Sequence, residues 1–135
     1  MLTALIDYES GNLHSALKAF EKISSENSLG SVTITNDPEI ISNADRLVLP
    51  GDGAFPACKA ALEKSEVFEA LKHAVLAKRR PFLGICVGMQ LMAKKGFEFE
   101  PTNGLNWING QVERIQLDDP SLKIRSEEHT SELQS

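Results

Sequence analysis

The chain has 135 residues, enough for one domain with a buried core, and its apolar content of 41% and charged content of 24% are ordinary for a globular protein. A net charge of −5 without a basic block excludes a nucleic-acid platform and a polybasic membrane surface, and no apolar run reaches the roughly 18 residues of a membrane span. Because there is no leader and no disulfide pattern for Cys58 and Cys86, we expect a cytoplasmic protein with reduced thiols.

Strand and helix patterns alternate along the chain. In order they predict a strand at 2–6, a helix at 13–23, a strand at 31–35, a short helix opened by Asp37 and Pro38, a strand at 46–50, a helix at 56–80 broken near Ser65, a strand at 81–85 and a helix at 87–95. The segment 107–117 alternates loosely and predicts a hairpin around Asn109–Gly110.

This alternation predicts an α/β fold with a doubly wound, flavodoxin-like and mostly parallel sheet covered on both faces. Ligands of such folds bind beyond the carboxyl ends of the strands. Three loops at that edge therefore matter most, namely 8–12, 50–55 and 84–90.

A cysteine stands between two glycines in GICVG, residues 84–88, directly after a predicted strand. This spacing is typical of a nucleophile on a tight strand-to-helix turn, where flanking glycines relieve crowding. The helix N-terminus behind Cys86 favours a thiolate, and the Val87 N–H can point at a developing oxyanion. The alternative is that Cys86 is a small apolar core residue, since buried free cysteine is common.

A second loop, PGDG at residues 50–53, ends the preceding strand with bare backbone amides. It can be a turn that merely needs glycine torsions, or the other half of an acyl-transfer site. Its position on a neighbouring strand, at the same sheet edge as Cys86, favours the second interpretation.

Three motifs in this order carry a family resemblance: DYESGNLHSALKAF, LVLPGDGAFPAC and PFLGICVGMQLM. Over about residues 2–117 the chain resembles the glutaminase subunits of imidazole glycerol phosphate synthase, which are class I (Cys-triad) glutamine amidotransferases. The resemblance implies hydrolysis of glutamine to glutamate and ammonia, without a metal or other cofactor. The ammonia would pass to a (β/α)₈-barrel cyclase subunit, in a heterodimer that serves histidine biosynthesis.

The resemblance also assigns roles to individual residues. Cys86 would attack the glutamine carbonyl and form a glutamyl thioester. The remaining assignments are Gly51, Asp52 and Val87 to the oxyanion hole, Gly84, Gln90 and Glu98 to glutamine binding, and Gly11 and Asn12 to the partner interface. Many relatives have an apolar residue where this chain has Asp52, and a carboxylate aimed at the oxyanion would oppose catalysis; the side chain can instead stabilise the turn or point to solvent or the partner.

The general base of the resembled family is a His two residues from a Glu, far downstream of the cysteine, and this sequence ends before that region. It offers only His14, His73 and His129. His129 lies in RSEEHTSELQS, which matches the translation of a widely used sequencing adapter; the alternative is a native disordered acidic tail. We therefore expect 1–124 to be the amino-terminal part of an amidotransferase domain lacking its C-terminal strands, 125–135 to be non-native, and the chain to be inactive.

Two other interpretations remain open at this point. Another Cys-elbow amidotransferase or hydrolase subunit would share GICVG but would not account for DYESGNL or PGDGAF. A non-catalytic flavodoxin-like module would bind phosphate at its strand ends, yet neither loop has a phosphate-binding glycine pattern and Asp52 disfavours an anion.

Overall fold

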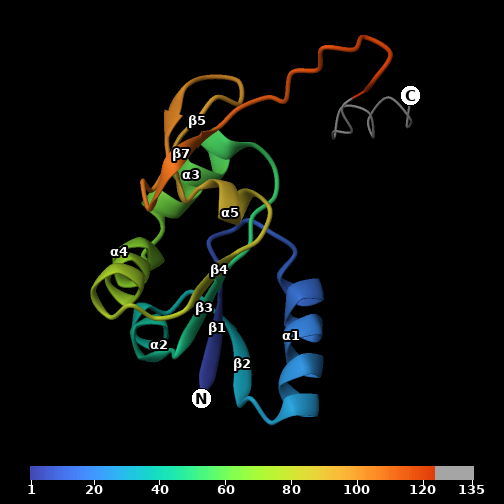
Figure 1. Cartoon of the computed structure of the whole chain (residues 1–135). Coiled ribbons are helices and arrows are strands. Elements are labelled where there is room, and N and C mark those ends of the chain that lie inside the picture. The colour runs from blue at the N-terminus through green and yellow to red at the C-terminus, as the bar shows by residue number, and fades with distance from the viewer. Residues whose placement is uncertain (124–135) are drawn as a thin grey trace.

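The computed structural model describes residues 1–123 (Figure 1). Its elements are β1 (Leu2–Ile6), α1 (Leu13–Asn27), β2 (Ser31–Thr35), α2 (Pro38–Asn43), β3 (Arg46–Leu49), α3 (Phe55–Lys64), α4 (Val67–Lys72), the π-helical turn η1 (His73–Ala77), β4 (Phe82–Gly84), α5 (Val87–Gln90), β5 (Ala93–Gly96), β6 (Thr102–Asn103) and β7 (Ile108–Val112). Within residues 1–123 no helix has the length and apolar character that crossing a bilayer requires.

The main sheet has four parallel strands in the order β2-β1-β3-β4. Helix α1 lies on one side of this sheet, and α2 and α4 lie on the other (Figure 1). Helices on both faces of a parallel sheet make the fold doubly wound, which confirms the predicted fold class. The carboxyl ends of β1, β3 and β4 lead into the three loops that the sequence singled out.

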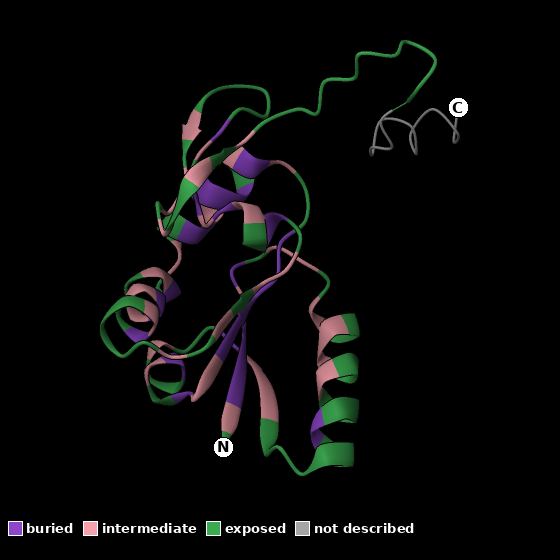
Figure 2. Cartoon of the chain, in the orientation of Figure 1, coloured by how far each residue is buried: buried purple, intermediate pink, exposed green. Residues whose placement is uncertain are grey.

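The core forms between the central strands and the helices on the α2 side. Figure 2 shows buried residues concentrated along β1 and β3 and on the helices beside them. The largest contributors to this cluster are fully buried; they are Ile6, Tyr8, Ile41, Leu47, Leu49, Phe55, Leu62, Val67, Leu71 and Leu91. Because β1 and β3 are covered on both faces, their near-continuous apolar sequences are what a central parallel strand requires.

Local signals in the first 85 residues lead to the predicted structures. The Asp37 carboxylate accepts a hydrogen bond from the Glu39 N–H at 2.9 Å and caps α2, with Pro38 as its first residue. The predicted break near Ser65 is also present, because Ser65 ends α3 and α4 begins at Val67.

The helix predicted over 87–95 is wrong beyond its first turn. Helix α5 has only four residues, and the chain then enters β5. The carbonyls of Leu91, Met92 and Ala93 accept hydrogen bonds from the backbone of 105–108 instead of from the next helical turn. Pairing with a later segment therefore overrides the local helical pattern. A one-turn helix also has a small macrodipole, which weakens the expected dipole effect on Cys86.

The hairpin predicted around Asn109–Gly110 is also wrong. Strand β7 continues through both residues and pairs in parallel with β5, with a register shift of one residue at this point; the other neighbour of β5 is the antiparallel β6. A two-residue type I′ hairpin needs positive φ at both central residues, and neither Asn109 nor Gly110 has it. The chain turns earlier, at Asn106, where φ is 59°.

Strand β4 has a neighbour on one side only within residues 1–123. Leu83 is in register with Val48 of β3, so both side chains point to the α1 side of the sheet. Val48 is buried, whereas Leu83 is 49% exposed. The described part of the sheet therefore ends on an open, partly apolar edge, of the kind that favours association with other chains.

Helix α5 and strand β3 approach each other closely at Gly88. A Cβ at Gly88 would overlap the carbonyl oxygen of Leu49, which is backbone and cannot move aside cheaply. We expect Gly88→Ala to lower the free energy of unfolding by about 1–3 kcal/mol, measured by urea denaturation. Gly110→Ala is the matched control, because a Cβ there meets no atom within 4 Å and should leave stability unchanged or slightly higher. Equal stability of the two variants would contradict the close backbone approach.

Candidate active site

Cys86 forms the bend between β4 and α5. Its backbone has φ 56° and ψ −120°, a conformation that costs energy for any residue with a side chain. The residue is exposed, and the Met89 and Gln90 N–H groups donate to its carbonyl at 3.0 and 3.1 Å. The strained bend thus holds the thiol at the surface, as the elbow interpretation predicts, and not in the core.

The glycines on either side allow this bend. A Cβ at Gly84 would lie 2.6 Å from the Met89 Cα and 2.8 Å from the Gly88 carbonyl oxygen. Gly88 in turn lies against the carbonyl of Leu49 at the end of β3. Both glycines are therefore required by close backbone contact, and the assignment of Gly84 to glutamine binding stays a prediction.

The PGDG loop lies directly beside the cysteine turn. The Val87 N–H donates to the Gly51 carbonyl at 3.3 Å, and a Cβ at Gly51 would lie 2.8 Å from the Gly88 nitrogen. The sequence interpretation that these two loops meet at one sheet edge is confirmed by this contact.

Two of the amides expected to form an oxyanion hole, those of Val87 and Asp52, already have partners in this structure. The Val87 N–H is bound to the Gly51 carbonyl, and the Asp52 N–H donates to the Ser10 hydroxyl at 3.0 Å. An oxyanion hole needs donors directed at the position of the developing charge. In this conformation the Val87 and Asp52 amides are therefore already bound, and the assignment of Gly51, Asp52 and Val87 to the oxyanion hole stays a prediction.

The side chain of Asp52 connects its own loop to the loop after β1. Its Oδ1 accepts hydrogen bonds from the Gly11 N–H at 3.0 Å and from the Ser10 hydroxyl at 3.3 Å. Of the interpretations that the sequence left open, the structure favours a stabilising role. The carboxylate binds donors in the 8–12 loop and is not directed at Cys86.

Three residues that sequence reasoning did not assign to the site complete this connection. Tyr8 donates to the Pro50 carbonyl at 2.6 Å, and burial raises the pKa of its phenol well above the usual range. The buried Cys58 thiol donates to the Asp52 carbonyl at 3.0 Å and lies 3.2 Å from the Ser10 hydroxyl. No sequence pattern marks these residues, because each acts on a partner more than five positions away in the chain.

The other two residues assigned to glutamine binding, Gln90 and Glu98, lie on α5 and beside the start of α3. Gln90 ends α5, one helical turn after Cys86, and is half-buried. Glu98 accepts a hydrogen bond at 2.7 Å from the N–H of Phe55, the first residue of α3. Because Ala54 at the N-cap has no side-chain acceptor, Glu98 supplies the missing cap. Glu98 therefore has a structural partner that the sequence did not indicate.

The residues assigned to the partner interface lie at the start of α1. The Asn12 side chain caps this helix by accepting from the Ser15 N–H at 3.2 Å, and Asn12 is exposed. Gly11 has φ 94° and lies against Pro50. This loop therefore presents a surface and is packed against the PGDG loop.

Within residues 1–123 no histidine is placed to act as the general base for the Cys86 thiol. His14 lies on α1 and His73 in η1, both are exposed, and no hydrogen bond joins either one to Cys86. His129 and the rest of 125–135 lie outside the described residues, so the interpretation of that segment stays a prediction. Among residues 1–123, no group of three or more His, Cys, Asp or Glu side chains is arranged to hold a metal ion.

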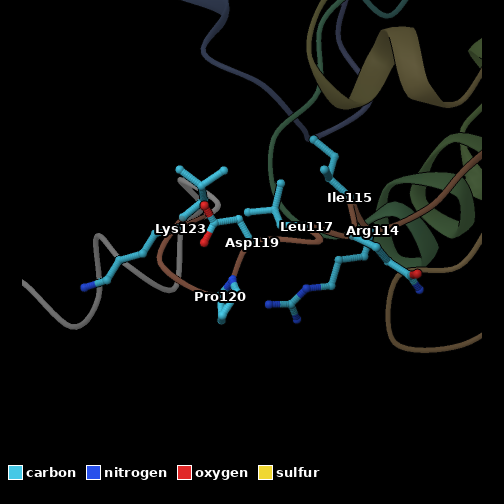
Figure 3. Close-up of a pocket in the computed structure, with 8 residues that line it drawn as sticks. Arg114, Ile115, Leu117, Asp119, Pro120 and Lys123 are labelled. Atoms are coloured by element: carbon cyan, nitrogen blue, oxygen red, sulfur yellow. The ribbon is translucent and has the colours of Figure 1, made fainter.

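An open pocket of about 600 Å³ lies away from this site (Figure 3). Its walls come from one extended segment, and the lining residues are Arg114, Ile115, Gln116, Leu117, Asp119, Pro120, Leu122 and Lys123. Since a single exposed segment forms the whole lining, the pocket has no rigid frame on which to place catalytic groups.

Comparison with known proteins agrees with this geometry. The sequence model of the family "Glutamine amidotransferase class-I" matches residues 4–129. A protein of Ruegeria pomeroyi named "Imidazole glycerol phosphate synthase subunit HisH" is 57% identical over 125 residues, which is 92% of this chain and 59% of that protein. Proteins with the same name from Cereibacter sphaeroides and Caulobacter vibrioides are 54% and 49% identical, over 92% and 90% of this chain.

The chain spans less than two thirds of the length of these relatives, 59%, 59% and 57% in the same order. The matched residues 4–129 include the turn at Cys86, the PGDG loop, most of β1 and all of β2, β3 and β4. Since the family model covers most of the chain and places the cysteine turn within the match, the chain belongs to the class I glutamine amidotransferase family.

Proposed function

We propose that this chain is the nucleophile-bearing part of a glutaminase subunit of imidazole glycerol phosphate synthase. The observation that carries the proposal is the exposed Cys86 on a positive-φ turn, with the next residue's amide in contact with the PGDG loop. The names of the relatives support this choice within the family. They also favour it over a phosphate-binding module on the same fold.

The proposed reaction has two steps. The Cys86 sulfur attacks the side-chain carbonyl carbon of glutamine; the C–N bond breaks, ammonia leaves with the thiol proton, and a glutamyl thioester remains. Water then cleaves the thioester to give glutamate and the free thiol. In this scheme Gln90 and Glu98 bind the substrate, and Glu98 pairs with its α-ammonium group.

The first step requires a local rearrangement of the PGDG loop. The oxygen that becomes negative needs the Val87 N–H, which is bound to the Gly51 carbonyl. Rotation of the peptide between Gly51 and Asp52 would remove that carbonyl and bring the Asp52 N–H to the same place. The rotation breaks the hydrogen bond from the Asp52 N–H to Ser10. The observed conformation is therefore a resting state.

The proposed partner is a (β/α)₈-barrel cyclase subunit, in a cytoplasmic heterodimer that uses the released ammonia for histidine biosynthesis. The word "subunit" in the relatives' names supports a complex. The Gly11–Asn12 loop is the proposed contact surface. It is joined to the resting PGDG loop by the hydrogen bond from Gly11 to Asp52.

Selective labelling tests the nucleophile. We expect the diazoketone analogue of L-glutamine to modify Cys86 and leave Cys58 intact, because only Cys86 is exposed. Peptide mass spectrometry locates the adduct, and excess L-glutamine should slow its formation. Cys86→Ala is the control. Modification of Cys58 at an equal rate, or no protection by L-glutamine, would overturn the proposed site.

Removing the Ser10 hydroxyl tests the resting state. We expect Ser10→Ala to accelerate modification of Cys86 by the diazoketone analogue about twofold to tenfold, since one hydrogen bond opposing the rotation is lost. The rate with iodoacetamide, which needs no oxyanion hole, should not change. Ser25→Ala, which removes an exposed serine hydroxyl on α1, is the matched control. An unchanged or slower analogue rate in Ser10→Ala would contradict the proposed rotation.

Turnover tests the role of the base. Because residues 1–123 place no histidine on Cys86, we expect glutamate release no faster than that of Cys86→Ala, with or without a cyclase subunit. A coupled glutamate dehydrogenase assay measures this. Sustained glutamate release that disappears in Cys86→Ala would show that the chain contains a complete catalytic set.

A further inference from the structure

The segment that carries Glu98 is attached to α3 at three points. Gly96, which precedes it, packs against the Phe55 ring so closely that a Cβ would lie 2.8 Å from the ring atoms. Glu98 accepts from the Phe55 N–H at 2.7 Å. Asn103, which follows the segment, accepts through its carbonyl from the Lys59 ammonium at 2.9 Å.

Lys59 is unusual because it is a buried lysine. Only 8% of its surface is exposed, and its Nζ lies 3.6 Å from the Glu63 carboxylate. Burying an ammonium group costs energy unless hydrogen bonds and an opposite charge compensate. The Asn103 carbonyl and Glu63 supply that compensation. The side chain is thus fixed in place and not one of many solvated rotamers.

Phe55 and Lys59, the two residues of α3 that contact the segment, lie on one face of the helix. Lys59 follows Phe55 by four positions, so their side chains are neighbours along the helix. Phe55 holds the start of the segment and Lys59 holds its end. Between them Phe97 and Phe99 are exposed, so little apolar burial holds the segment in position. Backbone pairing of β5 with β6 and the hydrogen bond from the Phe97 N–H to the Val112 carbonyl hold its base, and its position relative to the site then depends on the contacts with α3.

We propose that Lys59 is a positioning residue for glutamine binding, which acts by fixing the segment that presents Glu98. The inference rests on the proposed function, in which Glu98 binds the substrate's α-ammonium group. Lys59 does not touch the reacting atoms. Its effect is on the affinity for glutamine and not on the reactivity of Cys86.

The test measures inactivation of the full 135-residue chain by the diazoketone analogue of L-glutamine over a range of concentrations. We expect Lys59→Met to raise the half-saturating concentration roughly tenfold and leave the limiting rate unchanged, as the loss of one charged hydrogen bond would do. Lys59→Arg keeps a charged donor and should restore the wild-type value within about twofold. Lys64→Met, an exposed lysine on the same helix, is the matched control.

Hydrogen exchange gives a second readout that does not depend on glutamine. Amides of 97–102 should exchange faster in Lys59→Met than in Lys64→Met, with exchange in β1 and β3 unchanged. If Lys59→Met loses its folded circular-dichroism spectrum, Lys59→Gln replaces it, because the shorter side chain keeps a polar end but does not reach Asn103.

An unchanged half-saturating concentration, or a fall in the limiting rate and in iodoacetamide reactivity together, would overturn the positioning role. If the wild-type chain shows no saturable inactivation, the proposed function fails instead. In that case hydrogen exchange in 97–102 is the remaining test of whether Lys59 fixes the segment. Equal exchange in Lys59→Met and Lys64→Met overturns that role.

Discussion

The close approach of two backbone segments, Gly88 of α5 and the carbonyl end of β3 at Leu49, is the constraint on which the site depends. It leaves no room for a side chain at position 88 and brings the Val87 N–H onto Gly51. Cys86, which precedes Val87, then adopts a positive φ, and its thiol points outward. A buried, well-packed parallel sheet beneath the turn supplies the stability that maintains this strain.

Side chains from other elements then set the state of the loops around the thiol. Ser10, Asp52 and Cys58 join the loop after β1 to the PGDG loop through hydrogen bonds, and Ser10 binds the Asp52 amide. On the other side, Lys59 and the first amide of α3 hold the segment with Glu98. The position of the thiol is thus fixed by backbone packing. The PGDG loop and the segment with Glu98 are instead held by a few hydrogen bonds.

Sequence patterns predicted the parallel sheet, the first helices and the meeting of Cys86 with the PGDG loop, because periodicity, capping residues and strand ends are local properties with known consequences in this fold class. They failed for 91–112, where pairing between β5 and β7 replaces the rest of a longer helix and a hairpin. They also could not show the direction of the Gly51 carbonyl or the roles of Ser10 and Lys59. Those depend on hydrogen bonds between residues about 35 to 45 positions apart.

A crystal structure of the chain after modification of Cys86 by the diazoketone analogue would test the central claim most directly. The account predicts an exposed sulfur at a positive-φ Cys86, with the analogue's carbonyl oxygen on the Val87 N–H and the Gly51 carbonyl turned away. An adduct whose oxygen has no backbone donor, with the Val87 N–H still bound to Gly51, would contradict it.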